Sequence, residues 1–302
     1  MSQHTYNLSW GKNLYPISTD YFCFTPMKPN AKMAWVINTY ETETCNLTIN
    51  LQYSFDKENW TNYTPVIWDK DYEHAPTPTY ITLTGPVYWR GTNTQLVKYN
   101  NAGNGSMDYL HITGDSSSLM VSGNLSSLLN NTPDTAVILN SITEASQVYD
   151  EICGGTIIAS IFTGSSEIVD CSNMSFNVTY IPSYGLKNFF YGCYNLTKAP
   201  KLPYTTIFAS CYSNMFTGCV KLKMIPELPA RNIPEAAYND IFYGCNNIIF
   251  SDTQSDSTPN VYRIPKTGNN TSEYTYAIVN SDVSPNITLY YDTTYYTNAE
   301  VN

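Results

Sequence analysis

The chain has 302 residues, 42% of them hydrophobic, and a net charge of −10 at pH 7, which suits a folded protein with more than one core. Its 15 lysines and arginines form no cluster of the kind that binds phosphates, so the composition argues against a nucleic-acid partner. The acidic balance disfavours binding to an anionic membrane surface, and no run of about 18 apolar residues exists to span a bilayer.

Residues 1–118 predict a β-domain, and all five tryptophans fall within its first 90 residues. The alternation over Leu47–Phe55 is typical of a half-buried strand, and it ends at the polar turn Asp56–Asn59. Further short strands are expected at 32–37, 79–83, 87–90 and 109–112, with turns between them that include Gly103-Asn104-Gly105. This pattern predicts an antiparallel β-sandwich of immunoglobulin-like architecture, although the Cys-Trp-Cys spacing of antibody domains is missing.

Residues 119–252 contain an internal repeat. A constant step of 26 residues relates three copies of one pattern: Phe190-Tyr191-Gly192-Cys193, Phe216-Thr217-Gly218-Cys219 and Phe242-Tyr243-Gly244-Cys245. A period of roughly 20 to 29 residues with apolar positions in phase predicts a short leucine-rich-repeat solenoid of α/β type, whose units stack on a shared core. A degenerate copy at 161–165, with Ser165 in place of cysteine, is expected to cap the stack.

Within one repeat we expect a short helix over Ser210–Phe216, ended by Gly218 in the left-handed conformation. A strand should follow over Leu222–Ile225 before Pro226. The in-phase cysteines predict a column of buried free thiols. Disulfides and a metal site are the less favoured alternatives, because no CxxC or paired histidine is present.

Residues 253–302 lack the repeat and are rich in tyrosine, with strands expected at 261–264, 274–279 and 287–291. This segment is expected to be a β-rich module that either caps the solenoid or pairs with another subunit. The whole chain is therefore predicted to be multidomain.

Two groups of residues carry a family resemblance. Cys211-Tyr212-x-x-Met215-Phe216, followed by Gly218-Cys219 and Glu227-Leu228-Pro229-Ala230, resembles the BspA-type leucine-rich repeat. Upstream, Leu51–Asp56 with Trp60, and then Val87–Gly91, are similar to the β-domain that precedes such repeats in proteins of gut Bacteroidales and their phages, including crAss-like phages. The resemblance implies a surface-display role and brings no catalytic residues.

Candidate sites in the sequence are weak. Asp69-Lys70-Asp71-Tyr72-Glu73 could gather carboxylates for Ca²⁺, but His74 and Tyr80 stand where an EF-hand needs glycine and glutamate, so a solvated loop is favoured. His4, His74 and His111 have no spacing of a catalytic triad. Tyr191 and Tyr243 are candidates for ligand contact, with packing between coils the favoured interpretation. No catalytic residue, metal ligand or cofactor is expected, and no ligand-binding residue is assigned.

The expected function is that of a non-enzymatic phage virion protein, a fibre or decoration subunit on the particle surface. Expected partners are capsid or tail proteins, further copies of the chain as a homo-oligomer such as a trimer, and host-surface or mucus glycans or proteins. Nucleic acid and membrane insertion are not expected. Because Met1–Asn7 lacks the basic and apolar regions of a secretory signal, we expect assembly in the host cytoplasm. A bacterial cell-surface adhesin and a polysaccharide depolymerase with paired carboxylates remain as alternatives.

Overall fold

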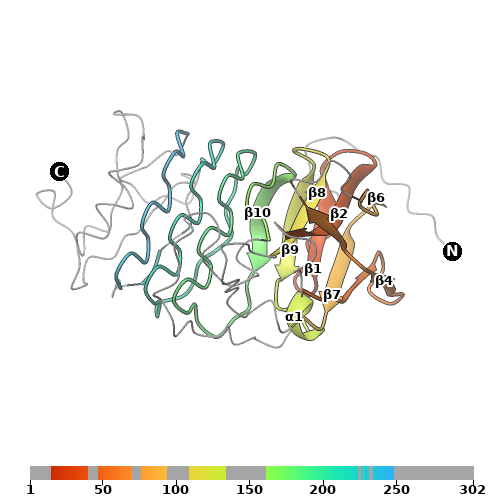
Figure 1. Cartoon of the computed structure of the whole chain (residues 1–302), viewed down its shortest axis with the longest axis horizontal. Helices are drawn as coiled ribbons and strands as arrows, with labels where there is room; N and C mark the ends of the chain where they lie inside the picture. Colours follow the sequence, from red (N-terminus) through yellow and green to blue (C-terminus); the bar gives the residue numbers. More distant parts are fainter. Residues whose placement is uncertain are drawn as a thin grey trace, which may run out of the picture.

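The structure is a computed structural model that describes residues 15–39, 47–69, 76–93, 109–133, 161–223, 226, 228–230 and 234–247. These residues form ten strands and one helical turn, α1, so the described part is β-rich with almost no helix. The strands form two mixed sheets at one end of the molecule, and the rest of the described chain forms a row of stacked coils beside them (Figure 1). No helix in the described part is long and apolar enough to cross a membrane.

The first sheet has six strands in the order β10-β9-β1-β7-β3-β4. Its members are β1 (Phe22–Pro26), β3 (Leu51–Ser54), β4 (Thr61–Tyr63), β7 (Val87–Gly91), β9 (Leu119–Asn124) and β10 (Ile168–Ser175). The second sheet has the order β5-β2-β6, with β8 also paired to β2. It comprises β2 (Ala31–Thr39), β5 (Val66–Asp69), β6 (Ile81–Leu83) and β8 (Tyr109–Gly114). The helical turn α1 (Ser127–Asn130) follows β9.

The expected strands at 32–37, 47–55, 79–83, 87–90 and 109–112 are found as β2, β3, β6, β7 and β8, with shifted ends. The expectation of a wholly antiparallel arrangement is wrong, because β2 pairs with β5 in parallel and β9 pairs with β10 in parallel. The first parallel pair arises because the chain leaves the second sheet after β2, forms the β3–β4 hairpin in the first sheet, and re-enters beside β2 in the same direction. The turn Gly103-Asn104-Gly105 lies outside the described residues.

The two sheets pack on an aromatic core. Trp35 of β2 and Trp89 of β7 are fully buried, and their rings meet edge to face with centroids 5.7 Å apart. Phe22 and Phe24 of β1 complete this layer. Fully buried aromatic rings contribute large apolar areas, and edge-to-face pairs add to that stabilisation.

The same core continues into the coils. Phe162, in the first coil, stacks on Phe22 of β1 at 6.2 Å and on Phe190 of the next coil at 5.6 Å, so one ring joins the sheet to the coils. Strand β9, which begins at Leu119, is hydrogen-bonded to β1 on one edge and to β10 on the other. Buried side chains from Phe22 to Cys245 therefore form one hydrophobic cluster.

The coil stack, defined as residues 161–165, 184–194, 210–220 and 236–246, uses two alternating kinds of hydrogen bond. Backbone N–H groups of even-numbered residues from Ser210 to Gly218 donate to carbonyls 25 residues later, in the next coil. Odd-numbered residues from Cys211 to Cys219 donate to carbonyls three residues earlier, in the same coil. The same pattern joins residues 184–192 to residues 209–217. Each coil is thus a series of tight turns, and the N–H groups that are not used within the coil donate to the neighbouring coil.

The expected helix over Ser210–Phe216 is therefore wrong. Ser210, Asn214 and Gly218 have φ of 53°, 55° and 75°, and a left-handed residue every fourth position cannot belong to an α-helix. A helix would also direct every N–H along its own axis and leave none for the next coil. The expected strand over Leu222–Ile225 is not found at the described residues Leu222 and Lys223, and residues 224–225 lie outside the described part.

Identical side chains stack in columns through the coils. Phe190, Phe216 and Phe242 lie with centroids 5.3 and 5.7 Å apart and planes 7° and 11° from parallel. Each in-phase cysteine donates its S–H to the carbonyl of the phenylalanine one coil earlier; Cys219 Sγ lies 3.1 Å from Phe190 O. The prediction of buried free thiols is confirmed for the six described cysteines, Cys23, Cys171, Cys193, Cys211, Cys219 and Cys245. Residues 253–302, with their expected strands, lie outside the described residues.

Candidate ligand-binding groove on the first sheet

A row of polar side chains crosses the outer face of the first sheet. Gln52 of β3 stands opposite Arg90 of β7 on one side and opposite Asn62 of β4 on the other. Arg90 Nε donates to Gln52 Oε1 at 2.8 Å, and Gln52 Nε2 donates to Asn62 Oδ1 at 2.8 Å. Strand alternation directs these three side chains away from the aromatic core, since Leu51 and Trp89 point into it. These two hydrogen bonds fix the orientation of the Gln52 and Asn62 side-chain amides.

Trp60 covers one end of this row. The Arg90 guanidinium lies 4.0 Å from the centre of the Trp60 ring, a cation–π contact, and the Tyr21 ring lies 4.9 Å away on the same indole. The indole is fixed because its Nε1 donates to Lys57 O at 3.0 Å. Trp60, at the end of the β3–β4 turn, thus covers the Arg90 side chain on the outer face of the sheet.

Asp56 builds that turn. Its carboxylate accepts hydrogen bonds from the backbone N–H groups of Glu58 and Asn59 at 2.9 and 2.8 Å, and from Ser54 Oγ at 2.8 Å. These bonds favour the ionised form, with the bond from the Asn59 side chain as the largest influence, and hold the pKa of Asp56 well below its usual range. The turn at Asp56–Asn59 that the sequence predicts is confirmed, and Lys57 within it has φ of 65°.

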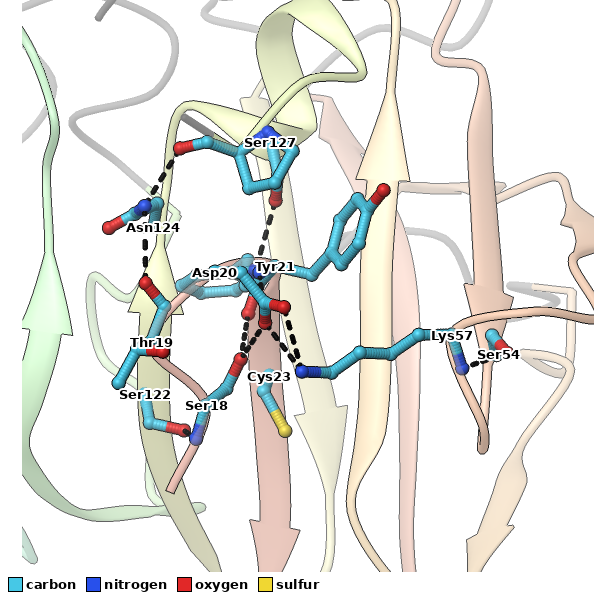
Figure 2. A network of polar contacts seen from close by, with 12 residues as sticks. Ser18, Thr19, Asp20, Tyr21, Cys23, Ser54, Lys57, Ser122, Asn124 and Ser127 are labelled. Carbon is cyan, nitrogen blue, oxygen red and sulfur yellow. Dashed lines mark hydrogen bonds and ion pairs between the residues drawn. The ribbon is translucent and has the colours of Figure 1, made fainter. Parts of the chain in front are cut away.

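A second polar network ties the segment before β1 to the same turn, as Figure 2 shows. Lys57 Nζ donates to both oxygens of Asp20, at 2.7 and 2.8 Å, and lies 4.6 Å from the centre of the Tyr88 ring. Asp20 also accepts from Ser18 Oγ at 2.8 Å. Burial raises the pKa of Asp20, but the hydrogen bonds from Lys57, Ser18 and Tyr21 outweigh it and leave that pKa below 3.8.

This network contains serine, lysine, aspartate and cysteine side chains, the types found in nucleophilic sites. Cys23 is fully buried, and burial raises its pKa to about 12, so its thiol stays protonated at neutral pH. The ammonium of Lys57 is paired with the carboxylate of Asp20 at 2.7 Å. The network positions the turn under Trp60.

Next to the polar row, the ends of β3, β4 and β7 and the C-terminus of α1 surround a groove of about 400 Å³. It is lined by Asn50, Leu51, Gln52, Asn62, Tyr63, Thr64, Gly91, Thr92 and Asn131. Gln52 and Asn62 belong to both the row and the groove. The groove is thus an uncharged, amide-rich and hydroxyl-rich surface.

The side chain of Asn93 connects two of the segments that surround the groove. It is fully buried, its Oδ1 accepts from Asn50 N at 2.7 Å, and its Nδ2 donates to Asn50 O at 2.9 Å and Leu128 O at 2.8 Å. This amide joins the start of β3 to α1. A Cβ on Gly91 would lie 2.4 Å from both Asn50 O and Asn93 Nδ2, so only glycine permits this close approach.

Of the residues singled out in the sequence, those that the structure describes do not line the groove. His111 is in β8, with its ring 6.0 Å from that of Tyr109, while His4 and His74 lie outside the described residues. Asp69 ends β5, and the rest of the acidic cluster is also outside. Tyr191 is half-buried and Tyr243 is 43% exposed, both on the coil stack. Among the described residues no three acidic, histidine or cysteine side chains converge as metal ligands would.

Sequence reasoning did not find the groove. The alternation over Leu51-Gln52-Tyr53 was a usable signal, because it separates Gln52 from the core-facing residues. It could not reveal that Asn62, Thr92 and Asn131 meet Gln52 in space. Comparisons of this chain with protein-family models, curated proteins and solved structures find no match.

Proposed function

We propose that this chain is a non-enzymatic surface subunit of a phage particle, a fibre or decoration protein. In this proposal an immunoglobulin-like β-sandwich carries a BspA-type leucine-rich-repeat solenoid. The observation that supports it most directly is the continuous core from Phe22 through Phe162 to Cys245, which joins the sheets rigidly to a stack of like coils.

Such a stack suits the display of a surface. The coils at 184–194, 210–220 and 236–246 repeat the same ring, thiol and backbone bonds, so the stack lengthens without a new kind of contact. The thiols of Cys193, Cys219 and Cys245, among the most reactive groups in the coils, are buried and donate to phenylalanine carbonyls. Free thiols are also compatible with assembly in a reducing cytoplasm.

The proposed partners follow from this role. One end of the chain would dock to capsid or tail proteins, and further copies would form a homo-oligomer such as a trimer. Host-surface or mucus glycans or proteins would be the external contacts. Many weak contacts on one particle act together, so a single subunit needs only modest affinity.

Immunogold electron microscopy with antibodies against the purified chain tests the location. We expect gold on purified phage particles and the intact chain in their peptide mass spectra. Label confined to the bacterial cell surface would instead establish the adhesin, and release of shorter saccharides from a polysaccharide would establish the depolymerase. Light scattering during size-exclusion chromatography should report a closed oligomer, and a stable monomer would count against an autonomous fibre.

A further inference from the structure

The lining of the groove between β3, β4, β7 and α1 points to a specific chemical class of ligand. We infer that this groove binds a neutral oligosaccharide. The inference deepens the proposed contact role and rests on it, but it concerns the first sheet and not the coils or the location of the chain.

The absence of charge in the lining selects a neutral ligand. None of the nine residues that line the groove carries a charged side chain at neutral pH. The one ionisable group among them, the phenol of Tyr63, is buried, and burial raises its pKa to about 12. A cationic ligand would leave water without a counter-charge here, which is unfavourable, and the cation beside the groove, Arg90, is already bonded to Gln52 and stacked on Trp60. Leu51 and Tyr63 are only 2% and 6% exposed, so a lipid or an apolar peptide side chain finds no apolar wall.

The polar groups match the chemistry of sugar hydroxyls. Six side chains supply the surface: the amides of Asn50, Gln52, Asn62 and Asn131 and the hydroxyls of Thr64 and Thr92. Every amide offers a donor and an acceptor about one hydroxyl spacing apart, and each threonine hydroxyl offers both on one atom. Adjacent sugar hydroxyls likewise donate and accept, so they can satisfy such a surface without leaving buried groups unpaired.

The groove is organised before the ligand arrives. Gln52 is fixed between Arg90 and Asn62, and because Asn62 accepts through Oδ1, its Nδ2 donors have no partner among the described residues. The main chain of Asn50 is held on both its N–H and its carbonyl by Asn93. Asn131 is held at the end of α1 with φ of 64°. Pre-oriented polar groups lower the entropy cost of binding.

The size of the groove fits a short chain of sugars. Its volume of about 400 Å³ falls in the lower part of the range of small-molecule sites, roughly 300 to 1,000 Å³. We therefore expect about two or three rings to be covered. Arg90, stacked on Trp60 and bonded to Gln52, is a positioning residue at the edge of the site.

A neutral-glycan array followed by calorimetry tests the inference on the full chain. The calorimetric probes are triacetylchitotriose, maltotriose and mannotriose, with sialyllactose and trialanine as the charged and peptide comparators. Thr92→Trp fills the groove from an exposed position, and Gln52→Ala removes an amide from it. Asn246→Ala is the matched control, an exposed asparagine on the coil stack. Retained thermal unfolding midpoints verify that each variant folds.

We expect at least one neutral glycan to bind with Kd of about 1 mM or tighter. Gln52→Ala should weaken binding by about tenfold, since a site that loses one good hydrogen bond loses about that factor. Thr92→Trp should weaken binding by about tenfold or more, because the indole would occupy the space of the ligand. Asn246→Ala should leave Kd unchanged. Binding of no arrayed neutral glycan, unchanged affinity in Thr92→Trp, or preference for sialyllactose or trialanine would overturn the inference. The gold labelling of phage particles is independent of all these outcomes. It can therefore refute the proposed location on the particle without refuting glycan binding in the groove, and the glycan assays can refute binding without refuting the location.

Discussion

Replacing Phe216 with alanine tests whether the coil stack is held by its ring column. Phe216 is fully buried and lies between Phe190 at 5.3 Å and Phe242 at 5.7 Å. Truncation of a buried phenylalanine costs about 3–5 kcal/mol, the sum of lost apolar transfer and the cavity left behind. We expect the upper half of that range, because both ring faces lose a stacked partner and the backbone of the coils is fixed by hydrogen bonds, which limits collapse into the cavity.

The damage should be local, because each coil contacts only its neighbours. The amides of Tyr212, Asn214 and Gly218 donate to the next coil, so their hydrogen exchange should accelerate. The amides of β1 and β7 should keep their protection. The four described tryptophans, Trp35, Trp60, Trp68 and Trp89, lie in or beside the sheets, so their fluorescence reports the sheets, whereas far-ultraviolet circular dichroism also reports the coils.

Urea unfolding followed by both signals, with exchange mapped by mass spectrometry, makes the measurement. In Phe216→Ala we expect the dichroism transition to begin at lower urea than the fluorescence transition. Tyr243→Ala, which removes a 43% exposed ring from the same stack, is the control and should cost less than about 1 kcal/mol. A loss below about 1 kcal/mol in Phe216→Ala, or equal loss of protection in every strand, would refute this account of the stack.

Three further predictions concern backbone strain, pH and thiol reactivity. Gly218→Ala should lower the free energy of unfolding in urea by about 1–2 kcal/mol, because residue 218 has φ of 75°, which disfavours a side chain. Steric overlap does not add to this loss, since the new Cβ would lie at an acceptable 3.6 Å from Gly192 Cα. An unchanged free energy of unfolding would show that the left-handed conformation is not retained. Burial raises the pKa of Asp170, but bonds from Lys198 and Ser172 leave it below 3.8, so its stabilisation is present above pH 3.8 and is lost as pH falls further. In Asp170→Asn the urea midpoint should be lower at pH 7 and should fall less between pH 4 and pH 3, and an unchanged slope would contradict the linkage. Iodoacetamide at pH 8 should leave the six described cysteines unmodified in the folded chain and should modify them in urea. The reason is that these thiols are buried, and burial raises the pKa of Cys23 and Cys245 to about 12. Labelling of Cys219 in the folded chain would disprove the buried column.

The 26-residue period was sufficient to predict which side chains share a column. Phe190, Phe216 and Phe242 stack, and Cys219 and Cys245 are buried, because residues in phase must occupy equivalent places when like units stack. The alternation around Leu51 likewise predicted β3, since apolar and polar residues alternate along a strand that lies between the core and solvent. Strand β1 was missed because Phe22, Cys23, Phe24 and Thr25 are all buried, and a strand covered on both faces shows no alternation.

The conformation inside each coil was not available from the same pattern. Ser210–Phe216 has helix-compatible spacing, but its alternate N–H groups are satisfied by the next coil and not four residues back. Local propensity cannot anticipate donors and acceptors that lie 25 residues away, and tertiary bonding overrode it. The left-handed residues Ser210, Asn214 and Gly218 are the local consequence.

The sequence by itself determined the period, the buried columns and half of the described strands, because these depend on the order of apolar residues along the chain. Only the tertiary structure decided the groove. Gln52, Asn62, Thr92 and Asn131 come from four separate segments, and the sheet register together with the close approach at Gly91 brings them to one place. A binding surface is a property of distances between segments, and those distances exist only after the strands have paired.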